Sequence, residues 1–188
     1  MNTRDLVLAA LFAAIIVALG LVPKIELGFF PVPITAQSLG VMLAGVILGG
    51  KRAAIAVLIV LLLVLIGLPV LAGGRGGLAV FAGPTAGFLL GWLPAAYLTG
   101  LASESLVDPA TSDMKQLMSF FLASVLGCIL VLYGCGIVYL SIAAKMGFVA
   151  AFKSSMIFIP VDVVKAFIAA LAGRAVLAGY PLLPRSKA

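Results

Sequence analysis

The chain has 188 residues, of which 64% are hydrophobic and 10% are charged, and its mean hydropathy is +1.33. A sequence with so few polar residues cannot cover the surface of a water-soluble protein. The composition therefore predicts an integral membrane protein. The net charge of +6 does not indicate a nucleic-acid partner. The twelve Lys and Arg residues lie scattered at the ends of apolar runs, as residues that set topology and contact lipid headgroups do.

The sequence contains no histidine and two cysteines, Cys128 and Cys135. On one helix their separation corresponds to about 10.5 Å of rise, which is too far for a disulfide, and we interpret both as small core residues. Without His or a Cys cluster we expect no metal site, no haem or iron–sulfur cofactor, and no Ser-His-Asp or Cys-His catalytic arrangement. The chain is therefore predicted not to be an enzyme.

Six apolar segments are expected to cross the membrane, since about 20 helical residues span the hydrocarbon. They cover residues 4–22, 35–49, 52–67, 84–101, 115–146 and 149–178. This predicts an all-α integral membrane protein with a single domain over residues 1–188. We expect a compact bundle of six transmembrane helices, with a glycine-rich loop between the third and fourth. The first segment resembles a signal peptide, but the later spans favour a transmembrane helix. Pro160 predicts a kink in the last segment.

An even number of crossings places both termini on one side of the membrane. Seven Lys and Arg residues lie on that side and four on the other, with Lys165 inside the sixth helix. The seven are Arg4, Lys51, Arg52, Lys115, Arg174, Arg185 and Lys187, and the four are Lys24, Arg75, Lys145 and Lys153. This excess favours a multi-pass protein of the cell membrane with cytoplasmic termini.

The connection over residues 23–37 contains three prolines and two phenylalanines and leads directly into the second helix. Thr35, Gln37 and Ser38 place polar groups in its first turn, where backbone N–H groups are unpaired. Thr35 is a candidate helix cap. Gln37 is a candidate donor and acceptor for a ligand.

The connection over residues 67–85 carries four glycines around Arg75. It is too hydrophobic to lie in water and too rich in glycine to be a spanning helix, which favours a mobile lid over a cavity. Arg75 either binds an anionic group or contacts lipid phosphates. No Gly-xxxx-Gly-Lys-Ser/Thr motif occurs, so uphill transport would need energy from another subunit or an ion gradient.

Asp162 and Lys165 lie inside the last apolar segment and project from nearly the same face of a helix. Each costs roughly 2.5–3.5 kcal/mol near the bilayer centre, so the pair indicates a function. Three interpretations stay open: a mutual ion pair, the polar floor of a ligand pocket, and a proton relay. The relay is the least favoured, because no second buried acid accompanies Asp162. Aromatic candidates for a pocket wall are Phe29, Phe30, Phe81, Trp92, Tyr97 and Phe158.

Three stretches make the chain similar to the BioY family, the biotin-binding S components of energy-coupling-factor (ECF) transporters. They are residues 31–45 (PVPITAQSLGVMLAG), residues 67–87 with GLPV and FAGPTAG at their ends, and residues 160–165 (PVDVVK). The resemblance implies a six-helix bundle that binds biotin near the outer face. It implies that Asp162 and Lys165 contact the vitamin, and that the loop from Gly73 to Phe81 covers it.

The resemblance thus implies that the loop brings Arg75 close to the ligand. Gly74, Gly76 and Phe81, on the same loop, are further candidates for the site. Gln37 joins them on its own chemistry. Biotin is expected as the transported ligand, not as a cofactor.

The resemblance also implies partners, namely a transmembrane coupling subunit and two cytoplasmic ATPase subunits. S components carry small residues along the first helix for docking. The repeats Ala9-xxx-Ala13 and Ala10-xxx-Ala14-xxx-Ala18 fit that pattern. The alternative is a stand-alone ion-coupled carrier for a small anionic solute, with Asp162 as the coupling acid.

Overall fold

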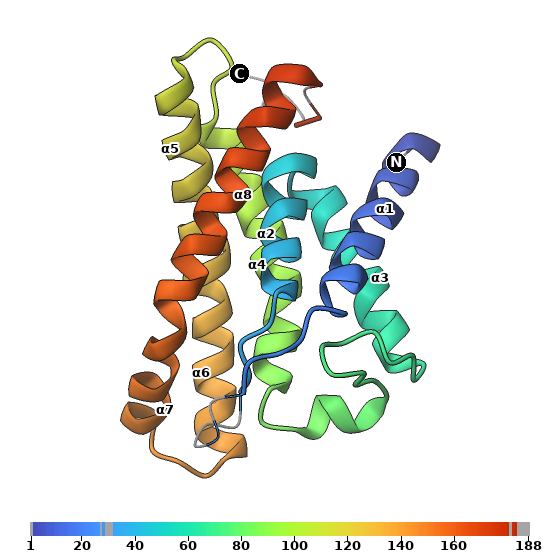
Figure 1. The fold of residues 1–188 in the computed structure, drawn as a ribbon, viewed down its shortest axis with the longest axis vertical. Helices are drawn as coiled ribbons and strands as arrows, with labels where there is room; N and C mark the ends of the chain where they lie inside the picture. Colours follow the sequence, from blue (N-terminus) through green and yellow to red (C-terminus); the bar gives the residue numbers. More distant parts are fainter. Residues whose placement is uncertain (1, 27, 29–31, 181, 184–188) are drawn as a thin grey trace.

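The computed structural model describes residues 2–26, 28, 32–180 and 182–183, and these form a bundle of helices (Figure 1). The α-helices are α1 (Thr3–Leu19), α2 (Gln37–Leu48), α3 (Gly50–Leu65), α4 (Ala86–Leu106), α5 (Asp113–Ser124), α6 (Val131–Ala143), α7 (Phe148–Ser155) and α8 (Ile159–Gly179). A π-helical stretch (Val125–Leu130) joins α5 to α6, and a 3₁₀ turn (Met156–Phe158) joins α7 to α8. The described residues therefore form six helical segments, which confirms the predicted bundle.

Three of these segments are long and apolar enough to cross a membrane by length and composition: Ala86–Leu106, Asp113–Ala143 and Phe148–Gly179. The helices α1, α2 and α3 are shorter, at 17, 12 and 16 residues. Ten of the twelve residues of α2 are buried, so this short helix runs through the protein interior.

The two ends of the bundle differ in what they carry (Figure 1). Both termini, the α2–α3 turn and the α4–α5 loop lie at one end, which we call the termini end. The α3–α4 loop and the α6–α7 turn lie at the other, which we call the cavity end. The two chain ends thus share one end of the bundle, as six crossings predict.

Glycines bring the helices close together around Thr99 of α4. A Cβ on Gly127 would lie 2.2 Å from the Thr99 backbone nitrogen, and one on Gly45 would lie 2.6 Å from Thr99 Cγ2. Only glycine allows such an approach, so α2 and the π-helical stretch pack directly on α4. Side chains therefore leave little free space in this part of the bundle.

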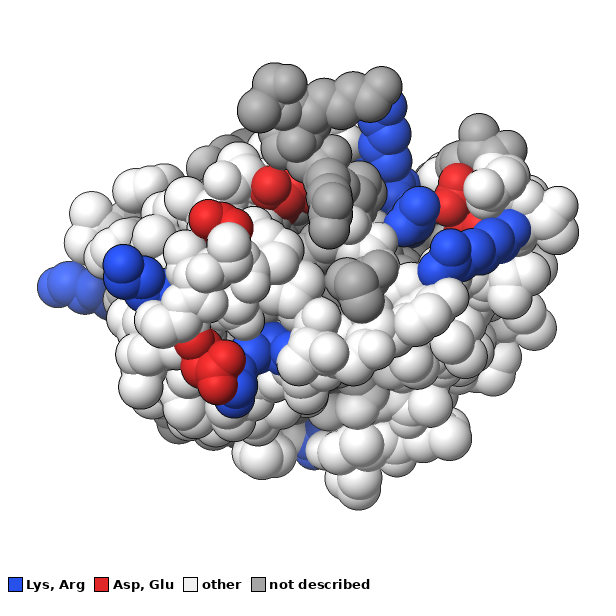
Figure 2. All heavy atoms as spheres, turned by 90° about the horizontal axis from the view of Figure 1, so that it is seen from above, with Lys and Arg blue, Asp and Glu red and all other residues white. Residues whose placement is uncertain are grey.

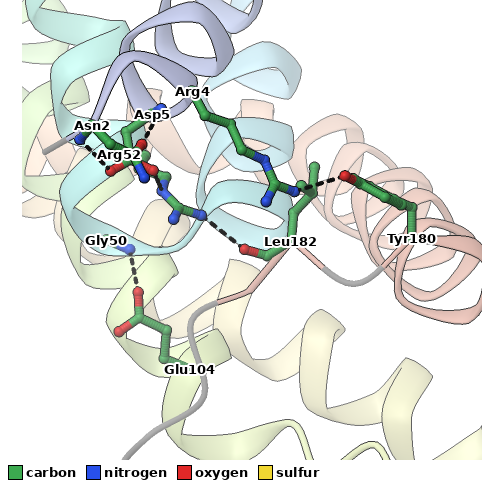
Figure 3. A network of polar contacts seen from close by, with 8 residues as sticks. All are labelled: Asn2, Arg4, Asp5, Gly50, Arg52, Glu104, Tyr180 and Leu182. Atoms are coloured by element: carbon green, nitrogen blue, oxygen red, sulfur yellow. Dashed lines mark hydrogen bonds and ion pairs between the residues drawn. The ribbon is translucent and has the colours of Figure 1, made fainter.

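Charged side chains of both signs gather on the termini end, among uncharged ones (Figure 2). Several of them fasten α1 to its neighbours (Figure 3). Arg52 on α3 pairs with Asp5 at an Nε–Oδ1 distance of 2.8 Å and donates to the Leu182 carbonyl at 2.9 Å. Arg4 donates to the Tyr180 hydroxyl at 2.9 Å and lies over its ring. These contacts fix the start of α1 against α3 and the end of the chain.

The last predicted segment is interrupted immediately before Pro160, where the sequence predicts a kink. The helix changes to a 3₁₀ turn over Met156–Phe158, and α8 begins at Ile159 with Pro160 in its first turn. There the missing N–H of proline removes no helical hydrogen bond. The break ends four residues before Asp162, which therefore lies in the first turn of α8.

Candidate functional site

A cavity lies at the cavity end, between the first turns of α2, α4 and α8, the start of α6 and the α3–α4 loop. The space between these elements, with the open solvent at its mouth counted, amounts to about 720 Å³. Its apolar wall is made by Val32, Leu71, Val80, Phe88, Leu89, Trp92, Leu132 and Phe158. Its polar lining is Thr35, Gln37, Ser38, Arg75, Thr85, Tyr133, Asp162 and Lys165. A mostly apolar pocket with a few convergent polar groups is typical of a small-molecule site.

Asp162 and Lys165 form the polar floor of this cavity. They lie three residues apart on α8, and Lys165 Nζ donates to Asp162 Oδ1 at 2.8 Å. The two residues are only 6% and 9% exposed. The pair is therefore a mutual ion pair that also lines the cavity, and its role in binding a ligand stays a prediction.

Two further helices contribute to the charged floor. The Tyr133 hydroxyl of α6 donates to Asp162 Oδ2 at 2.7 Å, and Lys165 Nζ donates to Ser38 Oγ of α2 at 3.0 Å. Hydrogen bonds to charged groups are stronger than those between neutral groups, so these hydrogen bonds orient both charged side chains. A carboxylate accepts more than one hydrogen bond on each oxygen and an ammonium has three donors, so both retain capacity for a guest.

Arg75 enters the cavity from a tight turn over residues 71–75, which we call the Arg75 turn. Leu71 and Arg75 exchange two backbone hydrogen bonds, of 3.0 and 3.2 Å. Gly73 and Gly74 close the turn with φ of 78° and 67°, values that side chains disfavour. Arg75 Nε is buried and has no hydrogen-bond partner among the described residues. An unpaired buried donor is costly, which favours an acceptor on a guest.

Gln37 lines the cavity, but its amide is engaged with backbone. Its Nε2 donates to the carbonyls of Ile16 and Val70, and its Oε1 accepts from the Ala72 N–H. Thr35 also lines the cavity, but it does not cap α2. The helix starts after Ala36 and has no side-chain cap, so the capping interpretation of Thr35 is wrong.

The other loop candidates lie around the cavity rather than in its lining. Gly74 borders a second hollow, between the Arg75 turn and the end of α1. A Cβ on Gly76 would lie 2.1 Å from the Leu68 carbonyl oxygen, so Gly76 permits the loop to fold on itself. Phe81 belongs to the 3₁₀ turn Leu78–Ala82, and its carbonyl accepts from the Tyr139 hydroxyl at 3.3 Å.

Of the aromatic candidates, Trp92 and Phe158 line the cavity. Tyr97 is 38% exposed and lies elsewhere on α4, and Phe29 and Phe30 are outside the described residues. Sequence reasoning missed Tyr133 and Phe88. The apolar run of residues 125–142 contains two tyrosines, Tyr133 and Tyr139, and nothing in the local sequence says which of them faces Asp162.

A second charged contact lies beside the Arg75 turn, at the second hollow. Lys24 pairs with Glu26 at 2.6 Å, and a Cβ on Gly73 would lie 2.7 Å from Lys24 Cε. The hydrogen bond from Lys24, helped by the charges of Lys24 and Arg75, lowers the pKa of the Glu26 carboxyl. The α1–α2 connection thus packs against the Arg75 turn from outside.

The two alanine repeats of α1 lie on different faces of the helix. Ala9 and Ala13 are buried in the core, whereas Ala10, Ala14 and Ala18 are exposed. The structure therefore separates a repeat that packs α1 into this protein from one that is free to meet another surface. Among the described residues no group of three His, Cys, Asp or Glu side chains suits a metal ion.

The chain is similar to known transport proteins over nearly its whole length. The sequence model of the BioY family matches residues 1–182. "Biotin transporter BioY" of Rhizobium etli is 68% identical over 184 residues, covering 98% of each chain. The protein of the same name from Rhodobacter capsulatus is 48% identical, covering 92% of this chain and 93% of the relative.

Among solved structures, the crystal structure of the S-component for biotin from an ECF-type ABC transporter superposes with a TM-score of 0.89. That protein is 32% identical, and the match covers 97% of both chains. The fold and the sequence agree over nearly the whole length. The chain belongs to the BioY family.

Proposed function

We propose that this chain is the biotin-binding membrane subunit of an ATP-driven importer of the ECF type. The names of the relatives and of the solved S component support this proposal. The observation that carries it is the cavity itself. A desolvated acid–base pair forms its floor, and Arg75, whose buried Nε has no hydrogen-bond partner among the described residues, also lines it.

Biotin carries functional groups that complement the polar and apolar lining of this cavity. Its ureido ring offers two N–H donors and one carbonyl, its thioether ring is apolar, and its side chain ends in a carboxylate. Asp162 accepts a ureido N–H, and Lys165 donates to the ureido oxygen. Arg75, on the loop at the mouth, meets the carboxylate. Because these bonds form in a site shielded from water, an analogue that lacks one group leaves a buried partner unpaired.

The energy for uptake comes from partner subunits in this proposal. A transmembrane coupling subunit docks on the exposed repeat of Ala10, Ala14 and Ala18, and two ATPases act from the cytoplasm. The termini end faces the cytoplasm and the cavity opens outward, as the excess of Lys and Arg at the termini end favours. Ala14→Trp should then prevent assembly with the coupling subunit while biotin binding persists. Ala13→Trp, in the buried repeat, should instead destabilise the fold.

Binding is tested by calorimetry on the purified protein in nanodiscs, with biotin as the titrant and biotin methyl ester as the comparison ligand. We expect saturable binding of biotin, weaker binding of the ester, and loss of most affinity in Asp162→Asn. Native mass spectrometry of gently extracted protein should show co-purified biotin. Absence of both the heat and the bound vitamin would overturn the proposal.

The energy source is tested separately in proteoliposomes. Uptake should require the coupling subunit, the ATPases and ATP. Uptake by this chain alone that collapses with an ionophore would instead establish the ion-coupled carrier.

A further inference from the structure

We infer that Gln37 is a positioning residue that holds the Arg75 turn over the cavity and ties it to helix α1. Its role in ligand binding rests on the proposed function, but the joint that it forms can be tested without any ligand. In this arrangement Gln37 acts on the ligand through Arg75 and not by direct contact.

The hydrogen bonds of the Gln37 amide go to backbone from two separate segments. Nε2 donates to the Ile16 carbonyl at 3.2 Å and to the Val70 carbonyl at 3.1 Å. Oε1 accepts the Ala72 N–H at 2.8 Å. The residue is 1% exposed, so these bonds replace water that cannot reach it. Both amide hydrogens and one oxygen position are thereby committed to protein, which leaves little for a ligand.

The bonded loop groups belong to the residues on either side of Leu71. Leu71 in turn exchanges two backbone hydrogen bonds with Arg75, at 3.0 and 3.2 Å. A series of hydrogen bonds therefore runs from Gln37, through the residues on either side of Leu71, to Arg75, whose buried Nε lacks a partner among the described residues. Displacing Val70 and Ala72 moves the base of the turn, so it changes where the guanidinium lies.

Helix α1 meets the same joint at its last turn. A Cβ on Gly20 would lie 2.6 Å from the Val70 carbonyl oxygen and 2.8 Å from Gln37 Nε2. Glycine is needed here for close approach, since its φ of −70° is ordinary. On the far side of the joint, the hollow bordered by Val17, Leu71 and Gly74 leaves room for the turn to move. Opening of the turn must therefore break the Gln37 bonds or carry the end of α1 with it.

The first experiment needs no ligand. In a Cys135→Ser background, Ala72→Cys places a thiol at a position that is 1% exposed, and Cys128 is buried. We expect Gln37→Met, which keeps length but loses the amide, to raise the maleimide labelling rate of that thiol about tenfold or more, because three hydrogen bonds that close the joint are lost. Gly20→Ala should raise it in the same direction, and Thr35→Val should leave it unchanged. An unchanged labelling rate in folded Gln37→Met protein would overturn the inference that Gln37 holds the Arg75 turn.

The second experiment is a double-mutant cycle with biotin. Gln37→Met and Arg75→Ala should each weaken binding about tenfold, and the double variant should bind no more weakly than Arg75→Ala alone. If the affinity losses of the two single variants multiply in the double variant, Gln37 contacts the ligand itself and the positioning role is overturned. If the parent protein binds no biotin while labelling responds as expected, the proposed function fails and the joint stands.

Discussion

The termini end and the cavity end use charge in opposite ways. At the termini end, Arg52 and Asp5 keep side-chain exposures of 25% and 13%, and their contacts connect α1, α3 and the chain end. At the cavity end, Asp162 and Lys165 fall to 9% and 11%, and they line empty space. Near water a pair of this kind contributes little free energy and mainly fixes geometry. A desolvated pair beside a cavity is costly to keep unless it serves binding.

Packing separates the two ends as well. Glycines press α2 and the π-helical stretch onto Thr99 of α4, without room for side chains. Toward the cavity end, α2 and α4 instead line the cavity, together with large side chains such as Trp92 and Phe158. The tight part serves as the scaffold, and the open part holds the ligand. Four sets of measurements test this division between a scaffold part and a ligand-holding part.

The largest effect is expected from Asp162→Ala. It leaves Lys165 buried without its partner and should cost about 3–5 kcal/mol of stability, along with nearly all biotin binding. The double variant Asp162→Leu/Lys165→Leu should regain the stability but not the binding. Thermal unfolding and calorimetry measure the two separately. Retained affinity in the double variant would show that the charged floor does not bind the ligand.

Arg75→Gln should weaken biotin binding by about 1.5–3 kcal/mol, since a charge-assisted bond to the carboxylate is lost. The variant should bind biotin and biotin methyl ester alike, whereas the parent prefers the acid. Arg75→Lys should not restore the preference fully, because an ammonium lacks the planar fork of guanidinium. An undiminished preference in Arg75→Gln would place the carboxylate elsewhere.

Tyr133→Phe removes one hydroxyl from the floor and should weaken biotin binding about tenfold, or about 1.4 kcal/mol. The ring still packs edge-on against Phe88 with centroids 6.2 Å apart, so stability should change less than in Asp162→Ala. Tyr139→Phe serves as the matched control, since its hydroxyl contacts the Phe81 carbonyl and not the charged floor. Equal losses in both variants would contradict a specific role for Tyr133.

The smallest effect is expected from Arg52→Ala at the termini end. Loss of a partly exposed pair should cost about 1 kcal/mol or less and leave biotin affinity unchanged. Chemical or thermal unfolding measures the first, and calorimetry the second. A large change in affinity would show that the two ends are not independent.

The sequence by itself determined the class of protein, the six helical segments and the placing of Asp162 and Lys165 on one helix face. These features follow from apolar run length and from helical spacing, both of which are local. The Gly-rich pattern likewise predicted a non-helical loop around Arg75, and the family resemblance predicted the fold of the whole chain.

Only the tertiary structure decided which distant groups meet. Tyr133 reaches Asp162 across 29 residues, and Lys165 reaches Ser38 across 127. It also turned Gln37 toward the backbone of α1 and the loop, and it buried one alanine repeat of α1 while exposing the other. Helical periodicity says which residues share a face, but the neighbour of that face is set by the packing of segments far apart in the chain.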